Sequence, residues 1–405
     1  MERTKDASEL RPASPDKIKS VPRRFSEGSR RYVVGQVEKF DQKNDMFKRP
    51  RWDPSVEFGK KYYGEVLPKE DRPGYTFLEM AFKNASWWVE LAFAQGVLGG
   101  KTGLLAWDAK QWGDSRPPTG LKHHVSDPEK MSRIIKKVAR FFGAGLVGIS
   151  EIDSRWIYSH SYSIQTKEHA PVDIPLGCKY AIVTALEMDY EAIRCSPNYI
   201  MGAAVGLGYS EEAFTAGLVA QFIRTLGYKA LPQGNDTSCS IPLAIDAGLG
   251  ELARNGLLIS PQYGPRVRIS KIFTDLPLVP DRPIEFGVWD FCRACEKCAD
   301  HCPSQAILHG EPTEEIHNIS NRKGILRWPI NGEKCLHFWA THGACCGSCI
   351  RVCPFNKPDT SFHRMVRWHV KHLPQFNRLY KWMDDACGYG KPLGAEDWWD
   401  QDDLI

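Results

Sequence analysis

The chain has 405 residues, of which 42% are hydrophobic, 11% aromatic and 25% charged. This composition excludes disordered and collagen-like proteins, and the length suits one large unit or two to three domains. The 53 basic and 49 acidic residues leave a net charge of only +4, too balanced for electrostatic binding of nucleic acid. No apolar run reaches the roughly 18 residues of a membrane span, so we expect a soluble protein that does not bind nucleic acid.

The first 130 residues are polar, rich in proline and aromatic residues, and weakly periodic. They predict an irregular, aromatic-rich N-terminal region that folds onto the rest of the chain. Within it, Arg23-Arg24-Phe25 resembles the core of a twin-arginine export signal. A polar segment follows where a signal peptide needs an apolar one, so we interpret the motif as a basic surface arm.

Residues 131–285 alternate between helical and extended patterns, which predicts a layered α/β domain. The predicted strands span residues 146–149, 180–186 and 267–273, and the predicted helices span 132–142, 210–226 and 241–253. Ser210 is expected to cap the second helix, with Glu211 and Glu212 in its first turn and Gly227 just beyond its end.

Thirteen cysteines are the most informative feature of the chain. None precedes Cys178, and nine lie from Cys292 to Cys353 at short spacings. A secreted disulfide scaffold would be short and would spread its cysteines along the chain. The clustering therefore indicates metal binding within residues 286–360, followed by a C-terminal strap over residues 361–405.

Two cysteine modules have the spacing of bacterial ferredoxins. The first is Cys292-x2-Cys295-x2-Cys298-x3-Cys302-Pro303, and the second is Cys346-x2-Cys349-x3-Cys353-Pro354 with Cys335 upstream. In this pattern the fourth cysteine of a run ligates the other cluster. The predicted ligand sets are therefore Cys292, Cys295, Cys298 and Cys353 for one 4Fe–4S cluster, and Cys302, Cys335, Cys346 and Cys349 for the second.

Spacing also distinguishes these ligands from the alternatives. Structural zinc needs Cys-x2-Cys pairs but not the paired Cys-x3-Cys-Pro endings. Cys345 competes with Cys346, although only Cys346 preserves the spacing of the second run. The other cysteines are expected to be buried apolar residues. The twelve histidines form no His-Glu-x-x-His motif, so we expect all of them to be ordinary surface or core residues.

The chain resembles the corrinoid-dependent reductive dehalogenases from about residue 130 onward. The resemblance rests on both cysteine modules and on five ordered motifs: Arg140-Phe141-Phe142-Gly143-Ala144; Gly234-Asn235-Asp236-Thr237 with Ile241-Pro242-Leu243-Ala244-Ile245; Ala247-Gly248-Leu249-Gly250-Glu251; Gly264-Pro265-Arg266-Val267-Arg268; and Phe273-Thr274-Asp275-Leu276-Pro277. It implies base-off cobalamin in a nitroreductase-like α/β (α+β) core spanning 131–285, with an inserted ferredoxin-like two-cluster domain that delivers electrons.

The resemblance also implies three site residues. The proton-donating tyrosine matches Tyr209, the supporting amide matches Asn235, and the cationic partner matches Arg268. Arg266 is the rival, because it alternates with Val267 and would project from the same strand face as Arg268. If Tyr209 stands just before a helix capped by Ser210, the helix dipole would favour its tyrosinate form.

The expected function is reductive dehalogenation by Co(I), as in organohalide respiration, on a small organohalide that the sequence does not identify. Attack of cobalt on carbon, attack of cobalt on the halogen and transfer of an electron are all compatible with the sequence. The resemblance implies an electron-donor protein or quinol-linked complex, a small membrane anchor and a peripheral location on the outer face of the cytoplasmic membrane; a cytoplasmic location and a homodimer are compatible alternatives.

Two alternative functions remain at this stage. An epoxyqueuosine reductase also combines cobalamin with two clusters, but it acts on tRNA and should present a basic surface. A corrinoid-activating electron-transfer protein would carry the clusters and have no substrate of its own.

Overall fold

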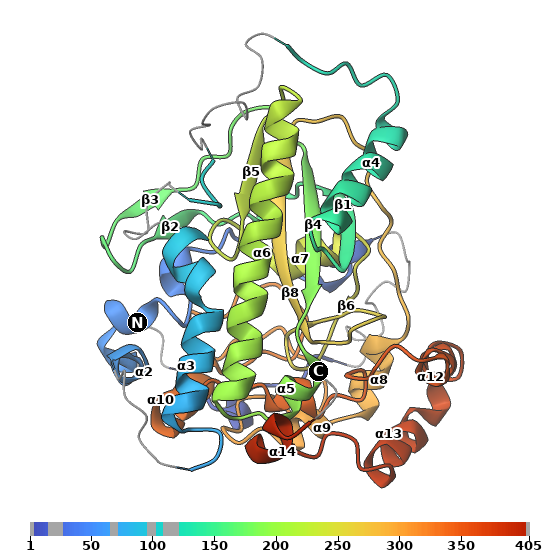
Figure 1. Ribbon diagram of the computed structural model, residues 1–405. Helices are drawn as coiled ribbons and strands as arrows, with labels where there is room; N and C mark the ends of the chain where they lie inside the picture. Colours follow the sequence, from blue (N-terminus) through green and yellow to red (C-terminus); the bar gives the residue numbers. More distant parts are fainter. Residues whose placement is uncertain (1–3, 15–26, 65–71, 95–102, 108–120, 402–405) are drawn as a thin grey trace.

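The computed structural model describes residues 4–14, 27–64, 72–94, 103–107 and 121–401 (Figure 1). The twin-arginine motif at residues 23–25 lies outside these ranges. Among the described helices, none combines the length and the apolarity that crossing a membrane requires.

A four-stranded antiparallel sheet forms the centre of the α/β unit. Its order is β1 (Leu146–Glu151), β4 (Tyr180–Glu187), β8 (Val267–Thr274) and β5 (Ala230–Gln233). The three predicted strands are confirmed. The edge strand β5 was not predicted, because its short sequence contains Pro232, which only an edge strand tolerates well.

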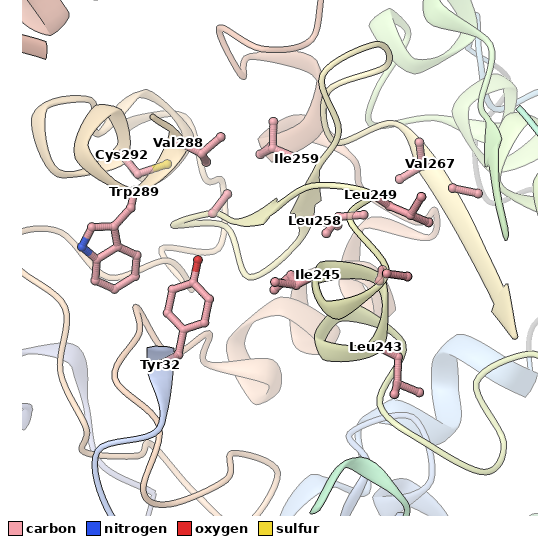
Figure 2. Close-up of a cluster of buried hydrophobic side chains, with 14 of the residues drawn as sticks. Tyr32, Leu243, Ile245, Leu249, Leu258, Ile259, Val267, Val288, Trp289 and Cys292 are labelled. Carbon is pink, nitrogen blue, oxygen red and sulfur yellow. The ribbon is translucent and has the colours of Figure 1, made fainter. Parts of the chain in front are cut away.

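Alternate residues of β4 face two different layers. Ile182 packs with the helices α4 (Pro128–Phe141) and α6 (Tyr199–Thr225) on one face of the sheet. Ala181 and Val183 pack on the other face with α7 (Ser240–Asp246) and with Trp289 and Cys292 of α8 (Val288–Ala294). Figure 2 shows this second cluster, in which Tyr32 from the N-terminal region lies beside Trp289.

Two predicted helix boundaries are wrong. The helix expected at Ser210 begins at Tyr199, where Asn198 caps it by accepting a hydrogen bond from the Met201 amide at 3.0 Å. Residues 199–206 are buried all round, so they show no polar face for a periodicity search to detect. The helix expected over 241–253 ends at Asp246, because Gly248 adopts a positive φ of 74° that turns the chain into β6 (Glu251–Leu252).

The N-terminal region is built from short elements, as its weak periodicity indicates. Among its described residues the longest helix is α3 (Phe77–Ser86), which packs along α6 (Figure 1). The other elements before the sheet are η1 (Ala7–Glu9), η2 (Gly28–Tyr32), η3 (Gln42–Asn44), η4 (Arg49–Arg51), η5 (Pro54–Val56), α2 (Gly59–Gly64) and the π-helical turn η6 (Glu90–Ala94).

The remaining elements connect the core or belong to the cysteine modules and the tail. Connecting elements are η8 (Ser154–Trp156), the hairpin of β2 (His160–Tyr162) and β3 (His169–Pro171), α5 (Tyr190–Arg194) and β7 (Leu258–Ile259). The modules contain α8, α9 (Lys297–Asp300), α10 (Gly332–His342) and α11 (Ser348–Arg351). The tail contains α12 (Ser361–His372), η9 (Pro374–Phe376), α13 (Asn377–Ala386) and α14 (Ala395–Trp399).

The tail contacts both the cysteine modules and the helical layer. Lys297 of α9 forms an ion pair with Asp384 of α13 at 2.5 Å. The indole of Trp399 in α14 donates a hydrogen bond to Glu79 of α3 at 3.2 Å. The tail therefore connects the first cysteine module to helix α3, which packs on α6.

Candidate active site

Three residues that are distant in sequence meet at one phenol oxygen. Tyr209 lies on α6, Asn235 follows β5, and Arg268 lies on β8. The Asn235 amide donates to the Tyr209 hydroxyl at 3.1 Å, and Arg268 Nη1 makes a longer contact with the same oxygen at 3.4 Å. The Arg268 guanidinium also lies 4.5 Å from the centre of the tyrosine ring. The positions singled out in the sequence thus form one polar cluster.

Trp87 completes the surroundings of the phenol. Its ring stacks on Tyr209 with 5.1 Å between ring centres and 28° between planes, and its Nε1 donates to the Gly202 carbonyl at 3.2 Å. A Cβ at Gly206 would lie 2.3 Å from Trp87, so this approach requires glycine. No sequence motif singles out Trp87, although Gly202 and Gly206 share one helix face and indicate close packing there.

The electrostatics of Tyr209 differ from expectation. The residue lies well inside α6 rather than at its positive end, so the predicted help from the helix dipole is wrong. Burial raises the pKa of Tyr209, and the nearby charge of Arg268 offsets this only in part. The phenol therefore keeps its proton at neutral pH, which a proton donor requires.

A buried hydrogen-bond relay orients the Asn235 amide. The Lys271 ammonium donates to the Gly234 carbonyl and, at 2.9 Å, to the Ser240 hydroxyl. Ser240 in turn donates to Asn235 Oδ1 at 3.0 Å, which leaves the amide nitrogen to face Tyr209. Burial lowers the pKa of Lys271. The sequence gave no signal for this relay, because its members are ordinary residues of a strand and a loop.

A buried acid lies one helical turn beyond Tyr209. Burial raises the pKa of Glu212 to about 8, although the charge of Arg268 opposes the shift. At neutral pH this side chain is mainly a protonated carboxylic acid. It lies 3.3 Å from the position that a Cβ would occupy at Gly234, next to the loop that carries Asn235.

The rival Arg266 lies in different surroundings from Arg268. It precedes β8, pairs with Glu187, and donates to the Lys357 carbonyl at 3.2 Å. Its guanidinium lies 5.3 Å from the ring of Tyr190. The two arginines therefore have different partners, and only Arg268 has a described contact with Tyr209.

The structure gathers the eight module cysteines into two groups. Beyond the effect of burial, the pKa of Cys298 is raised by the nearby thiols of Cys292, Cys295 and Cys353, with Cys349 also close. In the second group, the pKa of Cys349 is raised by burial and by the thiols of Cys346, Cys335 and Cys302, with Cys353 of the first group also close. Apart from this approach of the two groups at Cys349, the neighbours match the sets that the crossed spacing rule predicts.

Cys345 adjoins Cys346 but is not among the thiols that surround Cys298 or Cys349. Its sulfur is 3.8 Å from the Met201 sulfur on α6. Burial raises the pKa of Cys345 to about 11, and the charges of Lys83 and Arg268 oppose that rise. Beside it, the Gly347 amide donates to the Ser196 hydroxyl at 2.8 Å. The second cysteine group is therefore docked at the start of the helix that carries Tyr209.

Comparison with known proteins identifies this arrangement. The family model described as "Reductive dehalogenase subunit" matches residues 158–278, and that of the "4Fe-4S double cluster binding domain" matches residues 291–356. A tetrachloroethene reductive dehalogenase from Desulfitobacterium hafniense is 35% identical over 409 residues, covering 85% of this chain and 74% of the relative. The chain belongs to the reductive dehalogenase family.

Other relatives agree with this assignment of family. A tetrachloroethene reductive dehalogenase from Sulfurospirillum multivorans is 36% identical over 312 residues, covering 71% of this chain. A solved reductive dehalogenase structure, described as suggesting a mechanism for B12-dependent dehalogenation, aligns with a TM-score of 0.70 and 26% identity over 97% of this chain. The chain spans 61% of the Sulfurospirillum relative and 50% of that solved chain. An epoxyqueuosine reductase from Bacillus subtilis matches only 29% of this chain, at 32% identity.

Proposed function

We propose that this reductive dehalogenase removes halide from a small organohalide with cobalamin, and that two 4Fe–4S clusters supply its electrons. The observation that carries the proposal is the meeting of Asn235 and Arg268 at the Tyr209 hydroxyl, on a helix whose first turn contacts Cys345 beside the second cysteine module. The tetrachloroethene reductive dehalogenases among its relatives, together with the B12-dependent structure, supply the reaction class.

The residues present fit the proposed cofactors. The two cysteine groups offer four thiols each, and backbone amides point at them: Ala306 N lies 3.3 Å from the Cys302 sulfur. At the tyrosine site, Arg268 Nε and Asp236 Oδ1 are buried without a hydrogen-bond partner in the described structure. A corrin ring edged with amide groups would satisfy such atoms.

When bound, a corrinoid supplies the reduced cobalt that cleaves a carbon–halogen bond. The chain's own residues hold the proton that is transferred and stabilise the charge that its transfer leaves behind. Tyr209 holds it on the phenol oxygen, and the phenolate left after transfer is stabilised by the Asn235 amide and the Arg268 charge. Trp87 covers one face of the ring and limits the access of water. Arg268 also provides a positive charge for the departing halide.

The alternative functions receive less support. The match to the epoxyqueuosine reductase covers under a third of the chain, and the net charge of +4 suits tRNA poorly. Electron transfer alone does not require a phenol such as Tyr209 in contact with three polar or aromatic side chains. The membrane anchor, the external electron donor and the location at the outer face of the cytoplasmic membrane stay predictions from family resemblance.

Anaerobic reconstitution tests the proposal. The chain is loaded with iron, sulfide and cobalamin, and halide release is followed with reduced viologen across chloroethenes, chloroalkanes and halophenols. We expect bound corrinoid, about eight irons per chain, and halide release from at least one class. Bound cofactors without halide release would favour a tRNA reductase, and failure to bind corrinoid would favour an electron carrier.

A further inference from the structure

A second cluster of ligand-type side chains lies outside the tyrosine site. Asp41 precedes η3, whereas His160 and His169 belong to the β2–β3 hairpin. One ligand atom from each of the three lies within 4.8 Å of the other two. The His169 Nε2 atom is 3.0 Å from both carboxylate oxygens of Asp41, and the two imidazole rings are 4.8 Å apart.

The hairpin register explains how the histidines meet. Tyr162 pairs with His169, and His160 pairs with Pro171, so the two imidazoles are diagonal neighbours on one face of the hairpin. Eight residues separate them in the sequence. A search for helical metal motifs does not detect such a pair, which is why the histidines were expected to be ordinary.

Further hydrogen bonds orient these side chains, as hydrogen bonds from neighbouring groups orient the ligands of metal sites. The Ser159 hydroxyl lies 3.2 Å from His160 Nδ1, and within the described residues Nε2 is the ring nitrogen that keeps its lone pair for a ligand. The Lys43 amide donates to Asp41 Oδ1 at 2.9 Å and fixes the carboxylate. An ion pair between His169 and Asp41 alone does not account for the position of His160 beside them or for its hydrogen bond with Ser159.

We propose that Asp41, His160 and His169 bind a divalent transition metal, with Zn²⁺ as the best fit, in a site separate from the clusters and the corrinoid. Two imidazoles and one carboxylate favour zinc-type ions over Ca²⁺ or Mg²⁺. Tetrahedral Zn²⁺ at roughly 2.0–2.2 Å from its ligands needs about 3.3–3.5 Å between them. One pair of ligand atoms is already at 3.0 Å, and the His169 side chain is 34% exposed, so a small adjustment of the ring meets solvent on its open side.

The metal would tie the N-terminal segment to the hairpin beside the tyrosine site. Gln42, next to Asp41, accepts a hydrogen bond from the Tyr162 amide at 3.0 Å and donates to the Asn235 carbonyl at 3.3 Å. A metal at Asp41 would hold this bridge in place. Its role is structural, and no electron transfer is assigned to it.

Zinc binding to tag-free protein with both clusters loaded tests the proposal. The holoprotein is incubated with Zn²⁺ alone and desalted; bound zinc and Tm are then measured, and X-ray absorption at the zinc edge reports the ligands. We expect one zinc per chain with nitrogen and oxygen ligands, and a higher Tm than without zinc. His160→Ala and the milder His169→Gln should each lose the bound zinc and the Tm shift while keeping cluster absorbance.

His309→Ala is the matched control, because His309 pairs with Asp300 at 3.2 Å as an exposed histidine–carboxylate pair. It should keep the zinc. The proposal is overturned if desalting removes the zinc, if the ligands are sulfur, or if both hairpin variants bind zinc as the original protein does.

Discussion

Replacing Gly208 by alanine should displace Arg268 without unfolding the chain. Gly208 precedes Tyr209 on α6, and a Cβ there would lie 2.7 Å from Arg268 Cγ and 3.4 Å from Met188 Cγ. Non-bonded carbons prefer about 3.5–4.0 Å. The Arg268 stem must therefore move by about 1 Å, whereas the contact with Met188 needs almost no adjustment.

The effect of this substitution on the free energy of unfolding is smaller than its effect on the rate. Alanine improves helix propensity by about 1 kcal/mol, and overpacking costs about 1–3 kcal/mol, so the net change in the free energy of unfolding is small. A 1 Å displacement at a reacting group costs on the order of 10²-fold in rate. We expect Gly208→Ala to slow halide release by about that factor, with unchanged cluster absorbance and circular dichroism.

A double-mutant cycle assigns the loss to Arg268. In an Arg268→Ala background, Gly208→Ala should cause almost no further loss, which gives a coupling energy of about 2.7 kcal/mol for a 10²-fold effect. Full activity of Gly208→Ala, or an equal loss in both backgrounds, would refute the reasoning.

Three further predictions concern the clusters and the buried polar groups. Cys353→Ser should lose the iron of one cluster whereas Cys345→Ser keeps both, as iron analysis would reveal; equal iron in the two variants would contradict the grouping. Because the pKa of Glu212 is raised to about 8 by burial, the folded state holds an extra proton between about pH 4.5 and 8. The free energy of unfolding should fall with rising pH in this window by up to about 1.4 kcal/mol per pH unit. Glu212→Gln should weaken this pH dependence, as denaturant unfolding at several pH values would show; the same pH dependence in both proteins would count against the prediction. Ser240→Ala removes the bond to Asn235 and should slow halide release about threefold to tenfold, from the net worth of one hydrogen bond; an unaltered rate would show that the relay does not orient the amide.

Local sequence patterns determined much of the fold. The strand over 180–186 is continuous and apolar because β4 is buried on both faces. The helix ending before Gly143 was predictable because a glycine at φ 104° terminates it. The cysteine groups followed from spacing, since thiols two residues apart converge on one cluster.

Other features depend on tertiary contacts that spacing does not encode. The start of α6 escaped detection because Tyr199 and its neighbours are buried on every side. The stacking of Trp87 on Tyr209 depends on how α3 crosses α6, and the environment of Arg266 depends on Glu187 across the sheet. Family resemblance, rather than any local pattern, selected Tyr209, Asn235 and Arg268 together.

The proton donor is the central claim, and Tyr209→Phe tests it most directly. Tyr190→Phe is the matched control, because Tyr190 also lies near an arginine, 5.3 Å from the Arg266 guanidinium. Both variants would be loaded with clusters and cobalamin, and the rate of formation of dehalogenated product compared with that of the original chain. We predict a loss of at least about 10²-fold for Tyr209→Phe, the usual contribution of a positioned acid, and an unchanged rate for Tyr190→Phe. Product formation by Tyr209→Phe at the original rate would contradict the account.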